Sequence, residues 1–282
     1  MEQEEATAQE AAAALPSRAR RLLPPLMMPA ALLGGFIASN ALDATRETLL
    51  IACMSSLICG AWWATWRVLA ETSWTAAFKS WPAWRAGQPL PSLPYTIDGS
   101  PSQRTSLRLG QFRHWLIHEL LPVHGASILA AACASAAALI ISAALGAQAM
   151  LLTIGLTVLA QLAMLARPLS LIRSLLHNLA LLALPFTLGL AVMQPIVLDP
   201  QSDSQSATAL VFAAAAALAA LRGTALRHAG FAIVIALFLA LRHTVGAFII
   251  GVLWLPVLLL PGFRVPRWWP IIALLAGAVA LS

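Results

Sequence analysis

Residues 125–145 read GASILAAACASAAALIISAAL, a run that contains no charged side chain. An α-helix needs about 20 consecutive apolar residues to cross the hydrocarbon core of a bilayer. Most of this run is alanine, glycine and serine, and small residues let helix backbones approach closely in a membrane. The run therefore predicts one membrane-spanning helix in a tightly packed bundle.

The rest of the chain has a similar composition. Of its 282 residues, 60% are hydrophobic and 10% are charged, and the mean hydropathy is +0.82. A soluble domain averages about 25% charged residues, so this chain has too few charges to cover a surface that faces water. The three cysteines lie in apolar runs without a CxxC pair, which indicates packing residues rather than a disulfide or metal site. We predict an all-α, polytopic membrane helix bundle.

Nine apolar runs are candidates for membrane spans. The predicted spans are residues 22–40, 49–69, 125–145, 150–166, 176–198, 207–221, 228–241, 245–261 and 268–282. Two divisions stay open: residues 207–241 can form two spans or one bent pair, and four prolines blur the boundaries within residues 245–282. No predicted span carries Asp, Glu or Lys near its middle, which argues against a proton pump or an ion-coupled transporter.

The basic residues indicate how the chain crosses the membrane. With residues 1–21 as a polar cytoplasmic tail, fifteen of the seventeen Lys and Arg fall on the cytoplasmic side, and only Arg46 and Arg242 fall outside. Because cytoplasmic loops are enriched in Lys and Arg, this predicts a cytoplasmic N-terminus and a C-terminus on the other side. The tail lacks the pattern of a cleaved signal peptide. Because the Lys and Arg lie between apolar runs and do not cluster on one soluble face, they argue against nucleic-acid binding. We expect the protein to lie in a bacterial inner membrane.

Residues 22–282 are predicted to form a single transmembrane domain with one long cytoplasmic loop at 70–124. Residues 62–92, WWATWRVLAETSWTAAFKSWPAWRAGQPLPS, hold six of the ten tryptophans. Trp74, Trp81 and Trp84 share one face of a helix, with Lys79 and Arg85 beside them. This pattern is typical of an amphipathic segment in the membrane interface. The alternative is that these rings line a ligand pocket.

The second part of this loop contains turn formers and then histidines. Residues 87–110 hold the only tyrosine, Tyr95, and are expected to form a loop. QFRHWLIHELLPVHG (111–125) is expected to be helical, and it places His114 and His118 four residues apart, with His124 further on. Two histidines at this spacing can share a metal ion or bind a tetrapyrrole. A helix that faces solvent or headgroups is the other interpretation.

Three stretches are similar to segments of the UbiA superfamily of intramembrane prenyltransferases. They read RRLLPPLMMPAALLGGFIA (20–38), GQPLPSLPYTIDGSPSQRTSLRLG (87–110) and LARPLSLIRSLLHNLALLALPFTLGLAV (165–192), and together they cover about a third of the chain. The nine predicted spans and the long second-to-third loop also resemble that family. The resemblance implies a UbiA-like bundle and an isoprenoid or lipid ligand.

The chain departs from the family at its metal-binding motifs. The resemblance would place two aspartate-rich motifs, whose carboxylates hold Mg²⁺ on a diphosphate, in the second-to-third and sixth-to-seventh loops. Here the first region carries tryptophans and bases, and the second, LRGTALRHAG (221–230), has no acid. No Asp or Glu follows Asp203. Since Mg²⁺ requires oxygen ligands, we predict no metal site and no cofactor.

Six residues are candidates for substrate binding. Guanidinium groups bind phosphate without a metal, and aromatic rings can cover a lipid chain; the alternative for the bases is that they only mark the cytoplasmic side. The candidates are Trp74, Lys79, Arg85, Tyr95, Arg222 and Arg227.

We therefore expect a lipid- or isoprenoid-binding relative of the UbiA prenyltransferases, with catalysis left open. If it is an enzyme, it should resemble a prenyltransferase. The alternative is a permease or structural subunit of a larger membrane complex such as an ABC-type exporter, whose ATPase would be a partner because this chain has no Walker A motif. A third hypothesis, a pigment- or haem-binding protein, rests on the histidines. The sequence predicts no oligomeric state.

Overall fold

The computed structural model describes residues 26–40, 45–71, 74, 97, 99–166, 169–194, 204–221, 224–259 and 268–281. Every regular element in these ranges is helical. The helices are Leu26–Ala38, α2 (Arg46–Trp66), α4 (Pro101–Trp115), α5 (Leu121–Leu145), α6 (Ala147–Leu165), α7 (Ser170–Asn178), α8 (Leu184–Met193), α9 (Ser204–Ala219), α10 (Thr224–Ala240), α11 (Thr244–Leu259) and α12 (Trp269–Leu281). Three π-helical turns continue them: η1 (Arg67–Glu71), η3 (Leu116–Leu120) and η4 (Leu179–Ala183).

Each of the nine predicted spans coincides with one apolar helix. Four segments are long and apolar enough to cross a membrane: Arg46–Ala70, Pro101–Leu145, Ala147–Met164 and Ser170–Met193. The other five are shorter apolar helices: Leu26–Ala38, Thr208–Ala219, Ala225–Ala240, Thr244–Leu259 and Trp269–Leu281. The all-helical, membrane-embedded class predicted from the sequence is therefore confirmed.

The two open divisions in the C-terminal half have clear outcomes. Residues 207–241 form two helices, α9 and α10, which pack against each other. α11 contains Pro256 in its interior, and α12 begins at Trp269 with Pro270 in its first turn. A proline at the start of a helix sacrifices no hydrogen bond, because the first N–H groups of a helix have no partner within it.

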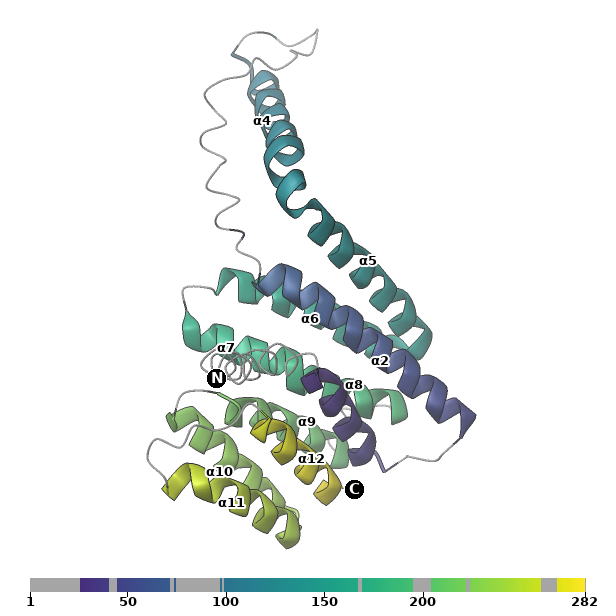
Figure 1. Ribbon diagram of the computed structural model, residues 1–282, viewed down its shortest axis with the longest axis vertical. Coiled ribbons are helices and arrows are strands. Elements are labelled where there is room, and N and C mark those ends of the chain that lie inside the picture. The colour runs from purple at the N-terminus through teal and green to yellow at the C-terminus, as the bar shows by residue number, and fades with distance from the viewer. Residues whose placement is uncertain are drawn as a thin grey trace, which may run out of the picture.

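The helices run back and forth across the bundle (Figure 1). In one half, α2 packs against α5 and α6; in the other, α9 to α12 pack together and α9 contacts α8. A chain of buried rings joins the halves: Phe186 of α8 meets Phe212 of α9 at a centroid distance of 5.6 Å, and Phe212 meets Phe238 of α10 at 5.9 Å. All three rings are almost completely buried.

One expectation for residues 87–110 was wrong. Residues 101–110 are helical, as the first part of α4, which continues through η3 into α5. The helix starts there because Ser100 accepts a hydrogen bond from the Gln103 N–H at 3.2 Å, and Pro101 occupies its first turn. Ser followed three residues later by Gln is the sequence pattern of a capping box. The turn formers of residues 87–110 had favoured a loop over this local signal.

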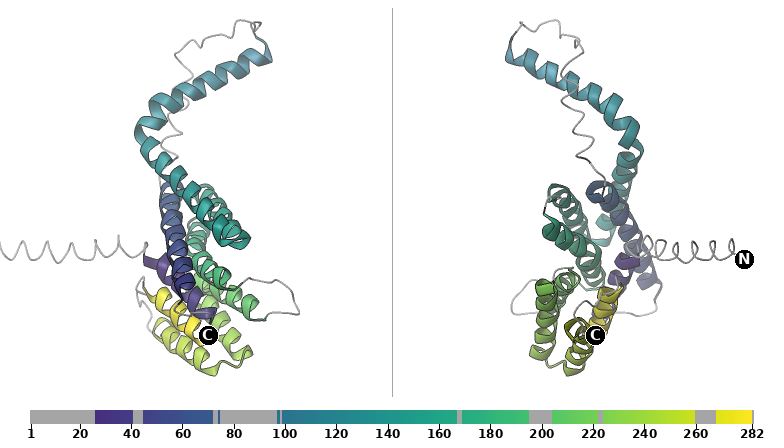
Figure 2. Two further views of the ribbon diagram at one scale, coloured as in Figure 1. Left: turned by 90° about the vertical axis from the view of Figure 1, so that its right-hand side faces the viewer. Right: turned by 60° about the vertical axis from the view of Figure 1, so that its left-hand side comes forward.

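Prolines explain where two of the π-helical turns lie. η3 ends two residues before Pro122, and η4 ends two residues before Pro185. A proline inside a helix removes an N–H and clashes with the carbonyl four residues back, so the preceding turn widens. At η3 the result is a bend, and Figure 2 shows that α4 leaves the line of α5 there.

The closest helix crossing brings together two glycines. A Cβ atom on Gly189 of α8 would collide with the Leu32 carbonyl oxygen and would lie 3.1 Å from the Gly35 Cα. A Cβ on Gly35 would in turn collide with the Phe186 carbonyl oxygen. The helix Leu26–Ala38 and α8 therefore touch backbone to backbone, which only glycine permits.

We expect Gly189→Ala to destabilise the protein because no side chain can move aside when the colliding atoms belong to the backbone. Overpacking of this kind costs about 1–3 kcal/mol. Thermal unfolding of the purified protein in detergent should show a lower midpoint than wild type.

Gly155→Ala in α6 is the matched control, since nothing lies within 4 Å of a Cβ at that position. Alanine is favoured over glycine in a helix by about 0.5–1 kcal/mol, so this variant should unfold at or above the wild-type midpoint. Equal midpoints for the two variants would contradict the crossing.

Candidate functional site

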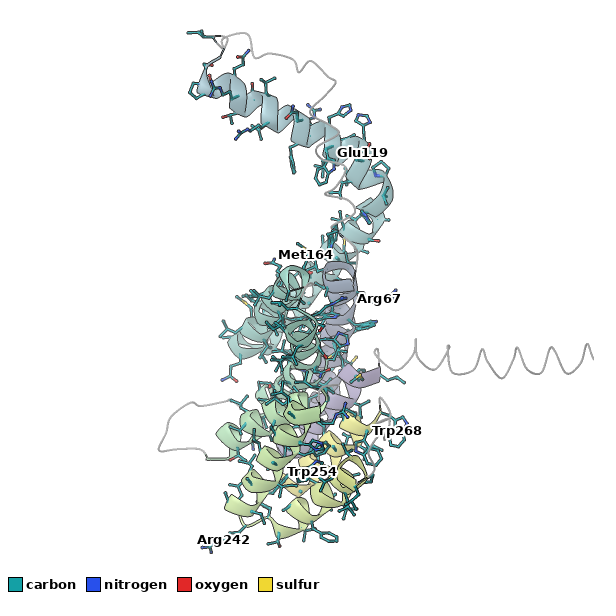
Figure 3. All side chains as sticks on the ribbon, turned by 90° about the vertical axis from the view of Figure 1, so that its left-hand side faces the viewer. Arg67, Glu119, Met164, Arg242, Trp254 and Trp268 are labelled. Atoms are coloured by element: carbon teal, nitrogen blue, oxygen red, sulfur yellow. The ribbon has the colours of Figure 1, made fainter. Side chains whose placement is uncertain are left out.

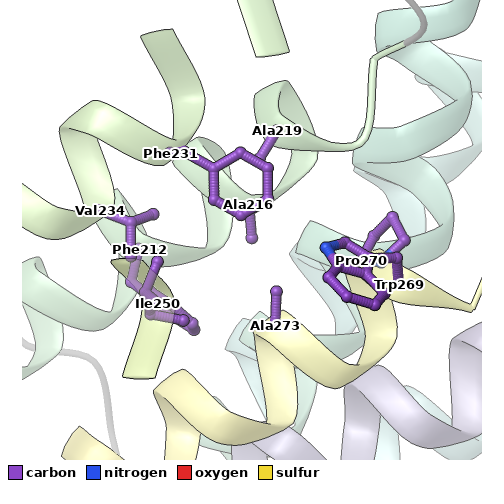
Figure 4. Close-up of a pocket in the computed structure, with 9 residues that line it drawn as sticks. All are labelled: Phe212, Ala216, Ala219, Phe231, Val234, Ile250, Trp269, Pro270 and Ala273. Carbon is purple, nitrogen blue, oxygen red and sulfur yellow. The ribbon is translucent and has the colours of Figure 1, made fainter. Parts of the chain in front are cut away.

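An apolar pocket lies between α9, α10, α11 and α12 (Figure 4). Its lining is Phe212, Ala216, Ala219, Phe231, Val234, Ile250, Trp269, Pro270 and Ala273. The empty space between these side chains, counted out to the opening, is about 360 Å³. The centre of a water-sized sphere can occupy only about 20 Å³ of it. The enclosed part of the pocket therefore has room for about one water-sized group, and a longer hydrocarbon group would also occupy the open part.

The small residues of the lining create this space. Ala216 and Ala273 come from facing helices and point towards the centre of the pocket, where larger side chains would fill it (Figure 4). The lining offers no charged group, and its one polar atom is the indole nitrogen of Trp269. That N–H donates to the Leu253 carbonyl at 3.1 Å. A cavity with such a lining stays dry and favours an apolar occupant.

An aromatic and histidine wall adjoins the pocket. Phe231 lines the pocket and stacks on Trp254 of α11, with ring centroids 6.3 Å apart and planes 11° apart. Trp254 also meets His228 of α10, at a centroid distance of 5.9 Å. Trp268 packs on Trp269 at 5.5 Å. Figure 3 shows Trp254 and Trp268 in the α9–α12 part of the bundle.

A hydrogen bond fixes the form of His228. The Trp254 indole N–H donates to His228 Nδ1 at 2.9 Å. An indole nitrogen is a donor only, so Nδ1 must be the unprotonated, accepting nitrogen. The ring is then neutral with its proton on Nε2, which can donate to a ligand oxygen.

Arg227 lies one turn before Phe231 on the same face of α10. Its Nε donates to the Leu221 carbonyl at 2.8 Å, which satisfies a carbonyl group just beyond the end of α9. The guanidinium group of Arg227 is thus held at the same end of the four helices as His228. A cation and a neutral N–H donor together suit a phosphate or another oxygen-bearing headgroup.

A second pair with the same bonding lies between α2 and α7. The Trp66 indole N–H donates to His177 Nδ1 at 3.2 Å, with ring centroids 5.7 Å apart. One turn before His177, Arg173 donates to the Ala70 carbonyl at 3.5 Å. This pair is partly buried in the main core and does not line the pocket, so we interpret it as structural.

The predicted site residues do not all come together. Trp74 is buried away from the pocket in a separate cluster with Trp115 and Leu120, and its indole N–H donates to the carbonyls of Val68 and Leu69 at 3.2 and 3.1 Å. Arg227 does not line the pocket either, but it lies one turn before the lining residue Phe231 on α10. Lys79, Arg85, Tyr95 and Arg222 lie outside the described residues.

Two of the histidines of the 70–124 segment, His114 and His118, lie side by side. The rings of His114 and His118 lie 4.0 Å apart, centroid to centroid, and desolvation and the neighbouring His118 lower the pKa of His114. His124 instead packs on Trp74 at 5.4 Å. Within the described ranges, no group of three or more His, Cys, Asp or Glu could hold a metal ion.

Sequence reasoning missed the pocket residues and the Trp254–His228 bond. His228 counted only among the histidines of the pigment- or haem-binding hypothesis, and Trp254 had no predicted role. A spacing of 26 residues gives no local signal, because the bond depends on how α10 and α11 pack.

No protein family, curated protein or solved structure matches this chain.

We expect Trp254→Phe to release His228 from its fixed tautomer, because phenylalanine keeps an aromatic ring but has no N–H. Loss of one such bond costs about 1 kcal/mol of unfolding free energy. Nitrogen NMR of histidine-labelled protein, with His228→Gln to assign the signal, should show the Nε2–H form in wild type and a mixture in the variant.

Trp268→Phe is the control, since Trp268 is 44% exposed and does not line the pocket. It should leave the His228 signal unchanged. An unchanged signal in Trp254→Phe as well would contradict the assigned bond.

Proposed function

We propose that this protein is a multi-pass membrane protein that binds the hydrocarbon chain of an isoprenoid or similar lipid in the α9–α12 pocket. The observation that carries the proposal is the pocket itself, a small, uncharged space among four apolar helices. Arg227 and His228 lie about one turn before its lining residue Phe231 on α10. An apolar cleft with a few converging polar groups is the usual form of a small-molecule site.

The proposed ligand has two chemically different ends. The hydrocarbon chain would lie against Phe231, Ala216 and Ala273. Its headgroup would face His228 Nε2–H and the Arg227 guanidinium, both donors without acceptor capacity in these protonation states. The protein would thus act as a divergent UbiA-like binding protein that recognises an oxygen-bearing headgroup directly.

The proposed function does not include metal-assisted diphosphate chemistry at this pocket. Residues 204–282 contain no Asp or Glu, so α9 to α12 cannot supply the carboxylates that Mg²⁺ needs. A prenyl transfer that depends on bridging magnesium ions would have to use ligands elsewhere in the chain. We therefore propose binding, not transfer, as the activity of this site.

The proposed topology has nine crossings, with the N-terminus in the cytoplasm of a bacterial cell. Its support is the unequal distribution of arginines between the two ends of the helices. Arg67, Arg173 and Arg227 lie at helix ends that would face the cytoplasm, while Arg46 and Arg242 lie at the opposite ends. The shorter helices would need local thinning of the bilayer or flanking residues to complete their crossings.

Filling the pocket should weaken ligand binding. Ala216→Leu or Ala273→Leu places a larger side chain in the space that the hydrocarbon chain would occupy. With radiolabelled geranylgeraniol and the purified full-length protein in nanodiscs, we expect binding at least about tenfold weaker, which corresponds to about 1.4 kcal/mol.

Ala232→Leu is the matched control, because Ala232 is an exposed alanine of α10 outside the pocket. It should bind as wild type does. Unchanged binding in both pocket variants, with their folding confirmed by thermal unfolding, would refute the site.

Binding of geranylgeranyl diphosphate should not depend on magnesium. We expect equal affinity with Mg²⁺ and with EDTA, because the headgroup contacts are Arg227 and His228. Arg227→Gln should weaken binding of the diphosphate more than that of the alcohol. Strongly Mg²⁺-dependent binding or transfer would show that the account of the missing carboxylates is wrong.

One observation favours the alternative of a subunit in a larger membrane complex. The helical segment 101–120 stands away from the main bundle (Figure 1), where a cytoplasmic partner could reach it. Stoichiometric co-purification of a soluble ATPase, lost when residues 101–115 are deleted, would support this second candidate.

A further inference from the structure

The arm, residues 101–120 (α4 and η3), is the part of the structure with the least packing against the rest. Its base is fixed by Trp115 and Leu120, which are buried in the cluster with Trp74. Beyond Trp115 towards Ser100, none of the arm's side chains is buried. Figure 3 shows Glu119 on this separate segment, away from the bundle.

The direction of the arm differs from that of the membrane-spanning helices. Figure 2 shows that α4 turns sharply off the line of α5 at η3 and then points away from the bundle. Because α5 is anchored among α2 and α6, its beginning marks one surface of the apolar layer. A helix that turns off at this point has the direction needed to lie along that surface.

One face of α4 carries exposed apolar side chains. Leu109, Phe112 and Leu116 follow one another at i, i+3 and i+7, which places them in one stripe. Leu109 is 63% exposed and Phe112 is 47% exposed. Phe112 is held towards this stripe by its contact with Trp115, at a ring centroid distance of 5.9 Å. Nothing in the described residues covers the stripe around Leu109.

Basic residues accompany this stripe. Arg104, Arg108 and Arg113 are exposed, and Arg108 and Arg113 fall on either side of the stripe. Glu119 is the single acid of residues 99–145, so the arm is strongly cationic. Arginine stems can lie along apolar surface while their guanidinium groups reach headgroup phosphates.

We propose that the arm binds the headgroup layer of an anionic membrane surface, with Leu109 and Phe112 inserted and the arginines on lipid phosphates. The arm carries apolar and basic side chains on one helix, and its base is attached at the surface of the apolar layer. Both features suit contact with an anionic lipid surface. A protein partner would need a matching acidic and apolar groove, whereas the lipid surface is already adjacent. The proposal is independent of the isoprenoid pocket.

The test measures the depth of two positions on α4 in the full-length protein. Cys53, Cys59 and Cys133 are first replaced by alanine, and a nitroxide is attached at Leu109→Cys or Gln111→Cys. These positions lie about 200° apart round the helix, so one label should face lipid and the other water. Collision with oxygen reports lipid exposure, and collision with a water-soluble nickel complex reports water exposure.

We expect the label at position 109 to collide mainly with oxygen in nanodiscs of phosphatidylcholine and phosphatidylglycerol, and the label at 111 mainly with nickel. The ratio of oxygen collision to nickel collision at position 109 should fall several-fold when the nanodiscs contain only phosphatidylcholine. It should fall similarly in the triple variant Arg104→Gln/Arg108→Gln/Arg113→Gln in the mixed-lipid nanodiscs. Arg46→Gln/Arg242→Gln, at the opposite ends of the helices, is the matched control and should leave the ratio unchanged.

Three results would overturn the proposal. Nickel collision at both positions would place the arm in water. An equal ratio at 109 in both lipid mixtures and in the triple variant would remove the role of anionic phosphates. Protection of both labels from both reagents would show that a second copy of this chain covers the arm.

Discussion

Direct contact between helix backbones is the constraint on which this structure depends. Gly35 and Gly189 bring the helix Leu26–Ala38 and α8 so close that neither position has room for a Cβ atom. Gly230 does the same for α10 against α9, where a Cβ would lie 2.8 Å from the Ala219 Cα. In a membrane, lipid chains are as apolar as side chains, so such close packing takes the place of hydrophobic burial as the force between helices.

This close packing also explains the pocket. Helices rich in alanine approach closely along most of their length, and the few large rings between them act as spacers. Phe212 is one such spacer: it packs on Phe186 and Phe238, and its ring occupies the space where Gly277 lacks a side chain. Where small residues face each other instead, at Ala216 and Ala273, space remains. The pocket therefore forms where small side chains of two facing helices lie opposite each other.

His177, Arg173, Arg227 and His228 lie near the ends of the helical segments, whereas the helix interiors hold hydroxyl groups such as Thr153, which accepts a hydrogen bond from the Trp62 indole N–H. The pairs Trp254–His228 and Trp66–His177 use an indole N–H to hold a neutral imidazole, and Arg227 is used to satisfy a backbone carbonyl. None of these contacts needs an acid.

The sequence by itself determined the class of protein and much of the secondary structure. Runs of apolar residues located nine helices, the Ser100–Gln103 pattern marked the start of α4, and the lack of acids after Asp203 excluded a carboxylate metal site in α9 to α12. The Ser100 signal was present in the sequence, but the turn formers of residues 87–110 had favoured a loop.

Only the tertiary structure decided which faces of these helices meet. Most of them are apolar all round, so no amphipathic stripe in the sequence indicates the side that turns inward. The Gly35–Gly189 crossing, the Ala216–Ala273 pocket and the Trp254–His228 bond each join residues on different helices. Their formation depends on how small side chains fit together, and spacing along the chain does not encode that fit.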